Sequence, residues 1–142
     1  MIRSRLLLLS FALVLVLAAC IPVSVPGLRN IDGQTWAASF EVEVQAGITN
    51  IRLPVDLALT FEQRLHDIDA QATLEYDAGI FRLQTGRLVQ LEGRLGLDDH
   101  LELRSGTNAL TFDGRFVGNQ LRGRVAIAGV VPVGDVTFTR VR

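Results

Sequence analysis

Hydrophobic residues follow two different patterns along this chain of 142 residues. From Leu6 to Ala19 they form one run, which Ser10 alone interrupts. From Trp36 onward they alternate with polar residues in short segments. The first pattern is typical of a cleaved leader, and the second is typical of β-strands that have one apolar and one polar face.

The alternation is clearest at residues 40–45, 51–61 and 68–76. Successive side chains of a strand point to opposite faces, and we expect the charged face to be the outer one, because charges in a narrow barrel are costly. Pro54 lacks a backbone N–H, so we expect its strand to lie at an edge or to be bulged there. Phe61 to Asp67 is the one stretch that could form a helical turn.

Shorter segments with the same pattern follow, separated by turns rich in Gly, Asn and Asp. They are residues 80–84, 88–97, 101–104, 109–117, 121–128 and 136–141. The turns are too short for crossover helices, so neighbouring strands should pair antiparallel. We therefore predict an all-β fold, an antiparallel meander of about nine strands of ordinary length. An up-and-down small barrel is favoured, and a two-sheet sandwich is the alternative.

A short motif recurs in which glycine is followed by arginine. The residue before the glycine is acidic in two copies and arginine in the third. Its copies are Leu91-Glu92-Gly93-Arg94-Leu95, Phe112-Asp113-Gly114-Arg115-Phe116 and, in part, Arg122-Gly123-Arg124-Val125. Parity places each glycine on the inner face, where it lets a closing strand bend. The outward acid and arginine residues should form exposed cross-strand ion pairs; a recognition stripe of arginines is the alternative.

The N-terminal run has the features of a signal helix. Arg3 and Arg5 give it a positive start, and it is shorter than the roughly 20 residues that cross a bilayer. Leu17-Ala18-Ala19-Cys20 resembles the lipobox of bacterial lipoproteins at every position. The alternative is an ordinary secretory leader that leaves Cys20 as a free thiol.

The lipoprotein resemblance implies cleavage between Ala19 and Cys20 and attachment of a diacylglyceryl group, with acyl chains such as palmitate, to the Cys20 sulfur. It implies a protein of the cell envelope that is held on a membrane by the lipid on Cys20. Because Ile21 rather than Asp follows the cysteine, the resemblance favours the outer membrane where one exists, and otherwise the cell membrane.

We divide the chain into the signal peptide 1–19, a lipidated tether 20–34 and one β domain 35–142, although part of the tether, such as 23–28, could pack on the domain. Removal of the 19-residue leader from 142 residues leaves 123, enough for one core. The leader contains two of the arginines, so the chain that remains has 12 basic and 15 acidic side chains. The resulting net charge of −3 lacks the excess of positive charge that is typical of proteins that bind nucleic acid.

Candidate chemistry is sparse. His66 with Asp67 and Asp69, and His100 with Asp98 and Asp99, have the appearance of metal ligands, but predicted turns often hold such residues. No Gly-x-Ser-x-Gly motif is present, and Ser24, Ser39 and Ser105 have no local base. We therefore predict no catalytic residue, metal or cofactor.

The inner face admits two interpretations. Trp36 and Tyr76 could frame a ligand pocket, or pack in a core. Small inner residues could leave a cavity or fit a filled core; they are Ala70, Ala72, Gly93, Gly114 and Gly123.

Three hypotheses for function follow from the sequence. We favour a non-enzymatic interaction or assembly module with an envelope protein as partner. The alternatives are a barrel that binds a small apolar ligand and, least favoured, a metal-assisted enzyme that uses His66 and His100.

Overall fold

The computed structural model describes residues 25–76, 87–128, 131–132 and 134–142. The predicted leader, the cleavage site at Ala19 and Cys20, and the strand predicted at 80–84 with its flanking turns lie outside the described residues. Among the described residues no helix is present, and the strands carry the whole architecture.

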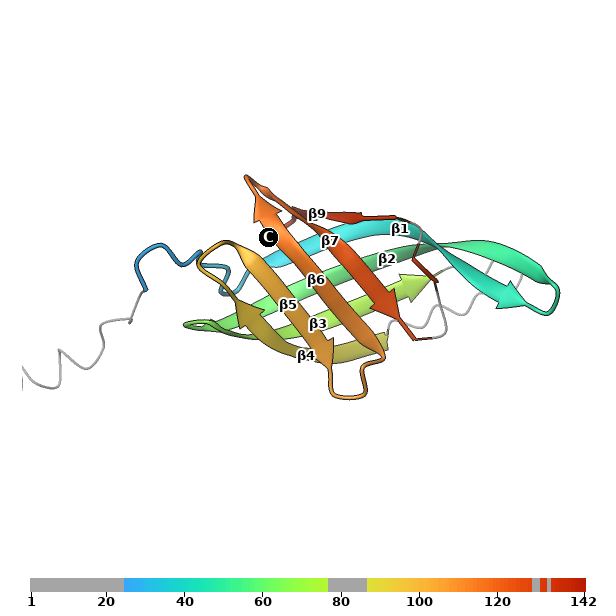
Figure 1. The fold of residues 1–142 in the computed structure, drawn as a ribbon, viewed down its shortest axis with the longest axis horizontal. Coiled ribbons are helices and arrows are strands. Elements are labelled where there is room, and N and C mark those ends of the chain that lie inside the picture. Colours follow the sequence, from blue (N-terminus) through green and yellow to red (C-terminus); the bar gives the residue numbers. More distant parts are fainter. Residues whose placement is uncertain (1–24, 77–86, 129–130, 133) are drawn as a thin grey trace, which may run out of the picture.

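Eight antiparallel strands close into a small barrel in meander order (Figure 1). Each strand from β1 to β6 pairs with the next along the chain, and the last strand, β9, pairs with both β7 and β1. This closure confirms the barrel and rejects the sandwich. The strands are β1 (Thr35–Ala46), β2 (Thr49–Arg64), β3 (Asp67–Tyr76), β4 (Arg87–Leu95), β5 (His100–Ser105), β6 (Leu110–Val117), β7 (Gln120–Ile127), the two-residue β8 (Val131–Pro132) beside β1, and β9 (Val136–Arg140).

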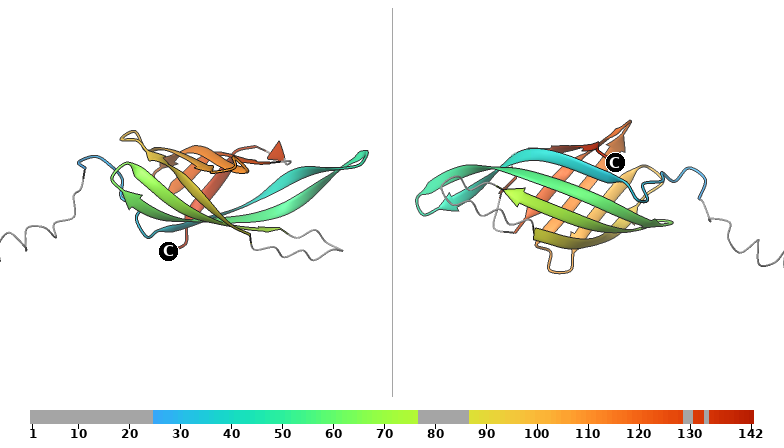
Figure 2. Two further views of the ribbon diagram at one scale, coloured as in Figure 1. Left: turned by 90° about the horizontal axis from the view of Figure 1, so that it is seen from below. Right: turned by 180° about the vertical axis from the view of Figure 1, so that it is seen from behind.

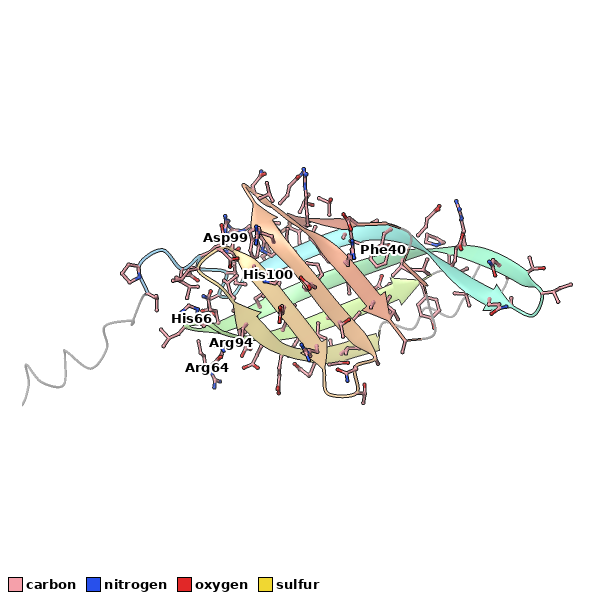
Figure 3. The ribbon with its side chains drawn as sticks, viewed as in Figure 1. Phe40, Arg64, His66, Arg94, Asp99 and His100 are labelled. Carbon is pink, nitrogen blue, oxygen red and sulfur yellow. The ribbon has the colours of Figure 1, made fainter. Side chains whose placement is uncertain are left out.

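The two ends of the barrel differ. We call one the plugged end: it holds the turns 65–66, 96–99 and 118–119 and the segment that precedes β1. At the opposite end β1 and β2 run on together past the other strands, as Figure 2 shows from two further sides. Figure 3 places His66, Asp99 and His100 toward the plugged end and Phe40 toward the opposite one.

The inner face is apolar and the outer face is charged, as predicted from the cost of placing charges inside a narrow barrel. β5, for example, buries Leu101 and Leu103 and exposes Glu102 and Arg104. The buried side chains form one cluster across the barrel. Its aromatic residues meet edge to face, with ring centroids 5.2 Å apart for Trp36 and Phe116 and 5.5 Å apart for Phe112 and Phe138.

The inner glycines allow neighbouring strands to approach closely. Gly114 lies directly opposite Gly123 on β7. A Cβ atom on Gly123 would overlap the carbonyl oxygen of Asp113, and one on Gly93 would overlap that of Glu102. The glycines alternate in step with buried neighbours such as Leu91 and Leu121, which confirms their predicted inner position. Only glycine fits there without moving a neighbouring strand.

The helical turn predicted at Phe61 to Asp67 is wrong. β2 continues to Arg64, which pairs with Asp67 across a two-residue turn of Leu65 and His66. Leu65 supplies the turn with a φ of 58°. Cross-strand pairing satisfies the backbone groups that a helical turn would have satisfied internally, so the alternation that began at residue 51 decides the structure.

Pro54 lies where β2 loses one of its neighbours. It pairs with Glu41 on β1, and the pairing of β2 with β3 begins at the following residue, Val55. The edge position expected for this proline agrees with that register, because a residue without an N–H is tolerated where a ladder ends.

Candidate functional site

The segment before β1 closes one end of the barrel. Ile31 is completely buried, and Leu28 packs against the core beside it. The N–H of Gly33 donates to the carbonyl of Phe61 at 2.8 Å, and the N–H of Phe61 donates to the carbonyl of Gln34 at 3.0 Å. Residues 28–34 of the predicted tether are therefore part of the folded body. Of the range 23–28 that was expected to pack, Leu28 does so, and residues 23 and 24 lie outside the described residues.

We call residues 28–34 the plug. Arg29 binds this plug to two turns of the barrel. Its Nε and Nη2 donate to the two carboxylate oxygens of Asp99 at 3.1 and 3.2 Å. Its Nη1 donates to the carbonyl of Gly118 at 3.2 Å, and its guanidinium lies over the Phe116 ring, 4.9 Å from the centroid. Such a planar, forked group suits a bidentate and stacked position better than the ammonium of lysine would.

Gln63 holds the plug from the side of β2. Its Oε1 accepts the N–H of Ile31 at 2.8 Å, and its Nε2 donates to the carbonyls of Arg29 at 3.0 Å and Leu65 at 2.8 Å. Its backbone N–H donates to Asp32 Oδ1 at 2.9 Å. One amide side chain therefore satisfies three backbone groups where the plug meets the turn.

At the opposite end, residues 41–54 form what we call the projecting hairpin (Figure 1). An ion pair of Arg52 with Glu43 at 3.2 Å marks its base, and residues 44–51 beyond it carry no charged side chain. Ile48 at the turn is fully exposed, and Ile51 is 47% exposed. Hairpin turns usually hold Gly, Asn or Asp, so an isoleucine that is bare at the tip is unusual.

A cluster of possible metal ligands lies on the outer face of β5 and β6. His100 Nε2 is 2.7 Å from Asp113 Oδ1, and His100 Nδ1 is 4.0 Å from Glu102 Oε1. Glu102 and Asp113 are directly opposite each other, and one ligand atom from each of the three residues lies within 4.8 Å of the others. The imidazole ring lies between the two carboxylates, and exposed acidic groups are often grouped in this way without a metal ion.

The structure does not join the two histidines in one site. Both lie at the plugged end (Figure 3), but Nδ1 of His66 is 2.8 Å from the carbonyl oxygen of Leu95. The acids beside His100 in the sequence are also engaged elsewhere, since Asp98 binds Arg115 and Asp99 binds Arg29. Asp113 was missed because it reaches His100 across a strand pairing; the parity of the outward residues on β5 and β6 was the available signal.

The barrel interior contains Trp36 as a core residue. Its ring is buried against Phe116, and its Nε1 donates to Gln34 Oε1 at 3.1 Å. Tyr76 lies half-buried at the end of β3.

Two depressions of the described surface lie outside the barrel wall, over β2–β4 and β5–β7, and outward polar side chains line much of both.

At the opposite end, four hydrophobic side chains are half-buried against the core. They are Phe40, Leu74, Val89 and Ile127. Ala70 and Ala72 are fully buried farther inside. The four half-buried side chains form an apolar rim that is partly accessible at this end of the barrel.

No family model, curated protein or solved structure matches the chain. The described residues include no helix that is long and apolar enough to cross a bilayer. The geometry of the plug, the projecting hairpin and the rim is therefore the basis for the functional argument.

Proposed function

We propose that this protein is a lipid-anchored module of the cell envelope, held on a membrane through Cys20, that binds a protein partner or an envelope assembly without catalysing a reaction. The lipobox resemblance at residues 17–20 supports the anchor. The barrel supplies a rigid support, and the projecting hairpin supplies the contact.

The observation that carries this proposal is the uncharged tip of the projecting hairpin. Ile48 has no cover among the described residues, and the Glu43–Arg52 pair lies at the base rather than near the tip. Exposed apolar side chains at interfaces are anchors that fill a pocket on the partner. The partner expected here has an apolar pocket for Ile48 and polar groups around it for the backbone and amides of the hairpin.

A photo-reactive amino acid at position 48, introduced in cells, tests the contact. We expect one dominant adduct of discrete mass, and no such adduct from position 62 on the barrel wall, where Glu62 is exposed. Recovery of the same partner from detergent extract should be lost in Ile48→Asn and kept in Leu88→Asn, because Leu88 is 61% exposed on β4 away from the hairpin. Equal labelling from 48 and 62, or equal recovery with both variants, contradicts the proposal.

The anchor is tested on its own by mass. The mature protein should start at Cys20 and weigh more than its amino acids by the mass of the acyl chains. A mature protein with the mass of its amino acids alone would reject the anchor, and the result at Ile48 would still stand.

A second candidate is a barrel that holds a small apolar ligand. It is favoured by the rim of Phe40, Leu74, Val89 and Ile127, which leaves part of the interior lining accessible at the opposite end. Native mass spectrometry of the protein extracted in mild detergent should then show a retained small molecule, and repeated recovery of the unliganded mass would count against it.

A further inference from the structure

Exposed apolar side chains gather at the plugged end. Seven large hydrophobic residues are exposed in the described parts of the chain, and four of them are at this end, with exposures of 47 to 63%. They are Leu65, Leu97, Val117 and Val141. Leu65 and Leu97 lie in turns, Val117 ends β6 and Val141 follows β9, so the four form an apolar fringe around one end of the barrel rather than a patch on one strand. Exposed apolar residues that gather on one side of a molecule mark a candidate surface for contact with a protein or a membrane.

Arginines without an acidic partner lie beside this fringe. Arg64 precedes Leu65, while Arg140 and Arg142 flank Val141, and all three are exposed. None of the three forms an ion pair with a described side chain. Three acids of this end are engaged, because Asp67 pairs with Arg94, Asp98 with Arg115 and Asp99 with Arg29. Asp32 and Glu62 are exposed and form no ion pair with a described side chain, so this end carries both signs of charge. Arg140 Nε donates to the carbonyl of Arg142 at 3.2 Å, and the remaining N–H groups of the three guanidinium groups are available to phosphate oxygens.

The chain leads from this same end to the lipidation motif. Val25 is the first described residue and precedes the plug. Figures 1 and 2 show the blue segment before β1 on the opposite side of the barrel from the projecting hairpin. Four residues, Ile21 to Ser24, lie between Cys20 and Val25. A chain of that length spans at most about 18 Å. A lipid on Cys20 therefore holds the plugged end within a short distance of the bilayer.

We propose that the plugged end rests on the bilayer that holds the Cys20 lipid. Leu65, Leu97, Val117 and Val141 enter the boundary between headgroups and acyl chains, and Arg64, Arg140 and Arg142 bind lipid phosphates. The projecting hairpin then points away from the membrane. The inference rests on the proposed anchor at Cys20. Because that anchor would keep the plugged end close to the bilayer, contacts that are individually weak would be enough to hold it there.

Site-specific labels test this orientation. Cys20 is the only cysteine of the chain, and acylation would block its thiol, so an introduced cysteine is the one position that a thiol-reactive, environment-sensitive dye labels. Leu97→Cys and Val117→Cys replace exposed residues and spare the core, and Ile48→Cys is a matched exposed control on the hairpin. Each labelled, acylated protein is reconstituted in vesicles of phosphatidylethanolamine and phosphatidylglycerol.

We expect a blue shift of dye emission and a loss of iodide quenching at positions 97 and 117, relative to the same proteins in detergent, and no change at 48. Exposure of position 97 or 117 on vesicles overturns the inference even when the mass shows the acyl chains. Shielding of all three positions also overturns it, because the molecule would then lie on its side. A mature protein without acyl chains removes the anchor itself and rejects the inference along with it.

Discussion

Arg29 and Asp99 form a bidentate ion pair, with N···O distances of 3.1 and 3.2 Å, that ties the segment before β1 to the turn between β4 and β5. Both side chains are about one-third exposed. Because the pair has two parallel N–H···O bonds, it is more tightly oriented than an ordinary surface ion pair. Together with the contact between Arg29 and the Phe116 ring, it holds the plug in place.

We expect Arg29→Ala to lower the free energy of unfolding by about 1–2 kcal/mol, because the ion pair, the bond to Gly118 and the contact with Phe116 are lost together. Arg29→Lys should recover less than half of that loss, because an ammonium cannot bind both oxygens of Asp99 in one plane. Urea unfolding of the two variants and of Asp99→Asn measures this. A double-mutant cycle with no coupling between positions 29 and 99 would contradict it.

Ile31 should be the main apolar contribution of the plug. It is completely buried, so Ile31→Ala should cost about 2–4 kcal/mol through lost burial and the cavity that remains. Ile48→Ala is the matched control: the same substitution at a fully exposed position should leave stability unchanged within about 0.5 kcal/mol. Equal effects at both positions in urea unfolding would show that the segment before β1 does not close the barrel.

Gln63 should matter through its amide. Gln63→Leu keeps much of the side-chain volume but leaves the N–H of Ile31 and the carbonyls of Arg29 and Leu65 without this partner. We expect a loss of about 1–3 kcal/mol, and faster amide hydrogen exchange at Ile31. Gln71→Leu, on the exposed face of β3, provides the comparison. Unchanged exchange at Ile31 would refute the assigned role.

The contact between Gly114 and Gly123 should be intolerant of a methyl group. Gly123→Ala would press a Cβ against the backbone of β6, so we expect a loss of about 2 kcal/mol or more, or a failure to fold. Gly106→Ala is the control, because a Cβ there meets no atom within 4 Å. Thermal unfolding of both variants tests this, and a Gly123→Ala protein as stable as Gly106→Ala would rule out the close approach.

The barrel was predictable because most of its pairings join neighbouring strands. Alternation and short turns determine such pairings locally, as at the turn between β6 and β7. The closure of β9 onto β1 was not visible in the same way, since a barrel and a sandwich share the same local pattern. The error at Phe61 to Asp67 came from reading turn residues in isolation from the strand that leads into them.

The plug could not be predicted from periodicity. Residues 28–34 show no period, and the partners of Arg29 are 70 and 89 residues away in the chain. The length of the projecting hairpin was equally hidden, because it depends on where β3 ends rather than on β1 and β2. The contact of His100 with Asp113 needed the register of β5 against β6.

The last strand of the described chain is also the one that fastens the seam. β9 places Arg140 opposite Trp36, near the start of the first strand, and the N–H of Val141 donates to the carbonyl of Thr35 at 2.9 Å. Contacts so distant in sequence form late and slowly. A polypeptide that still lacks β9 therefore cannot close the barrel, even where its neighbouring strands have already paired as hairpins.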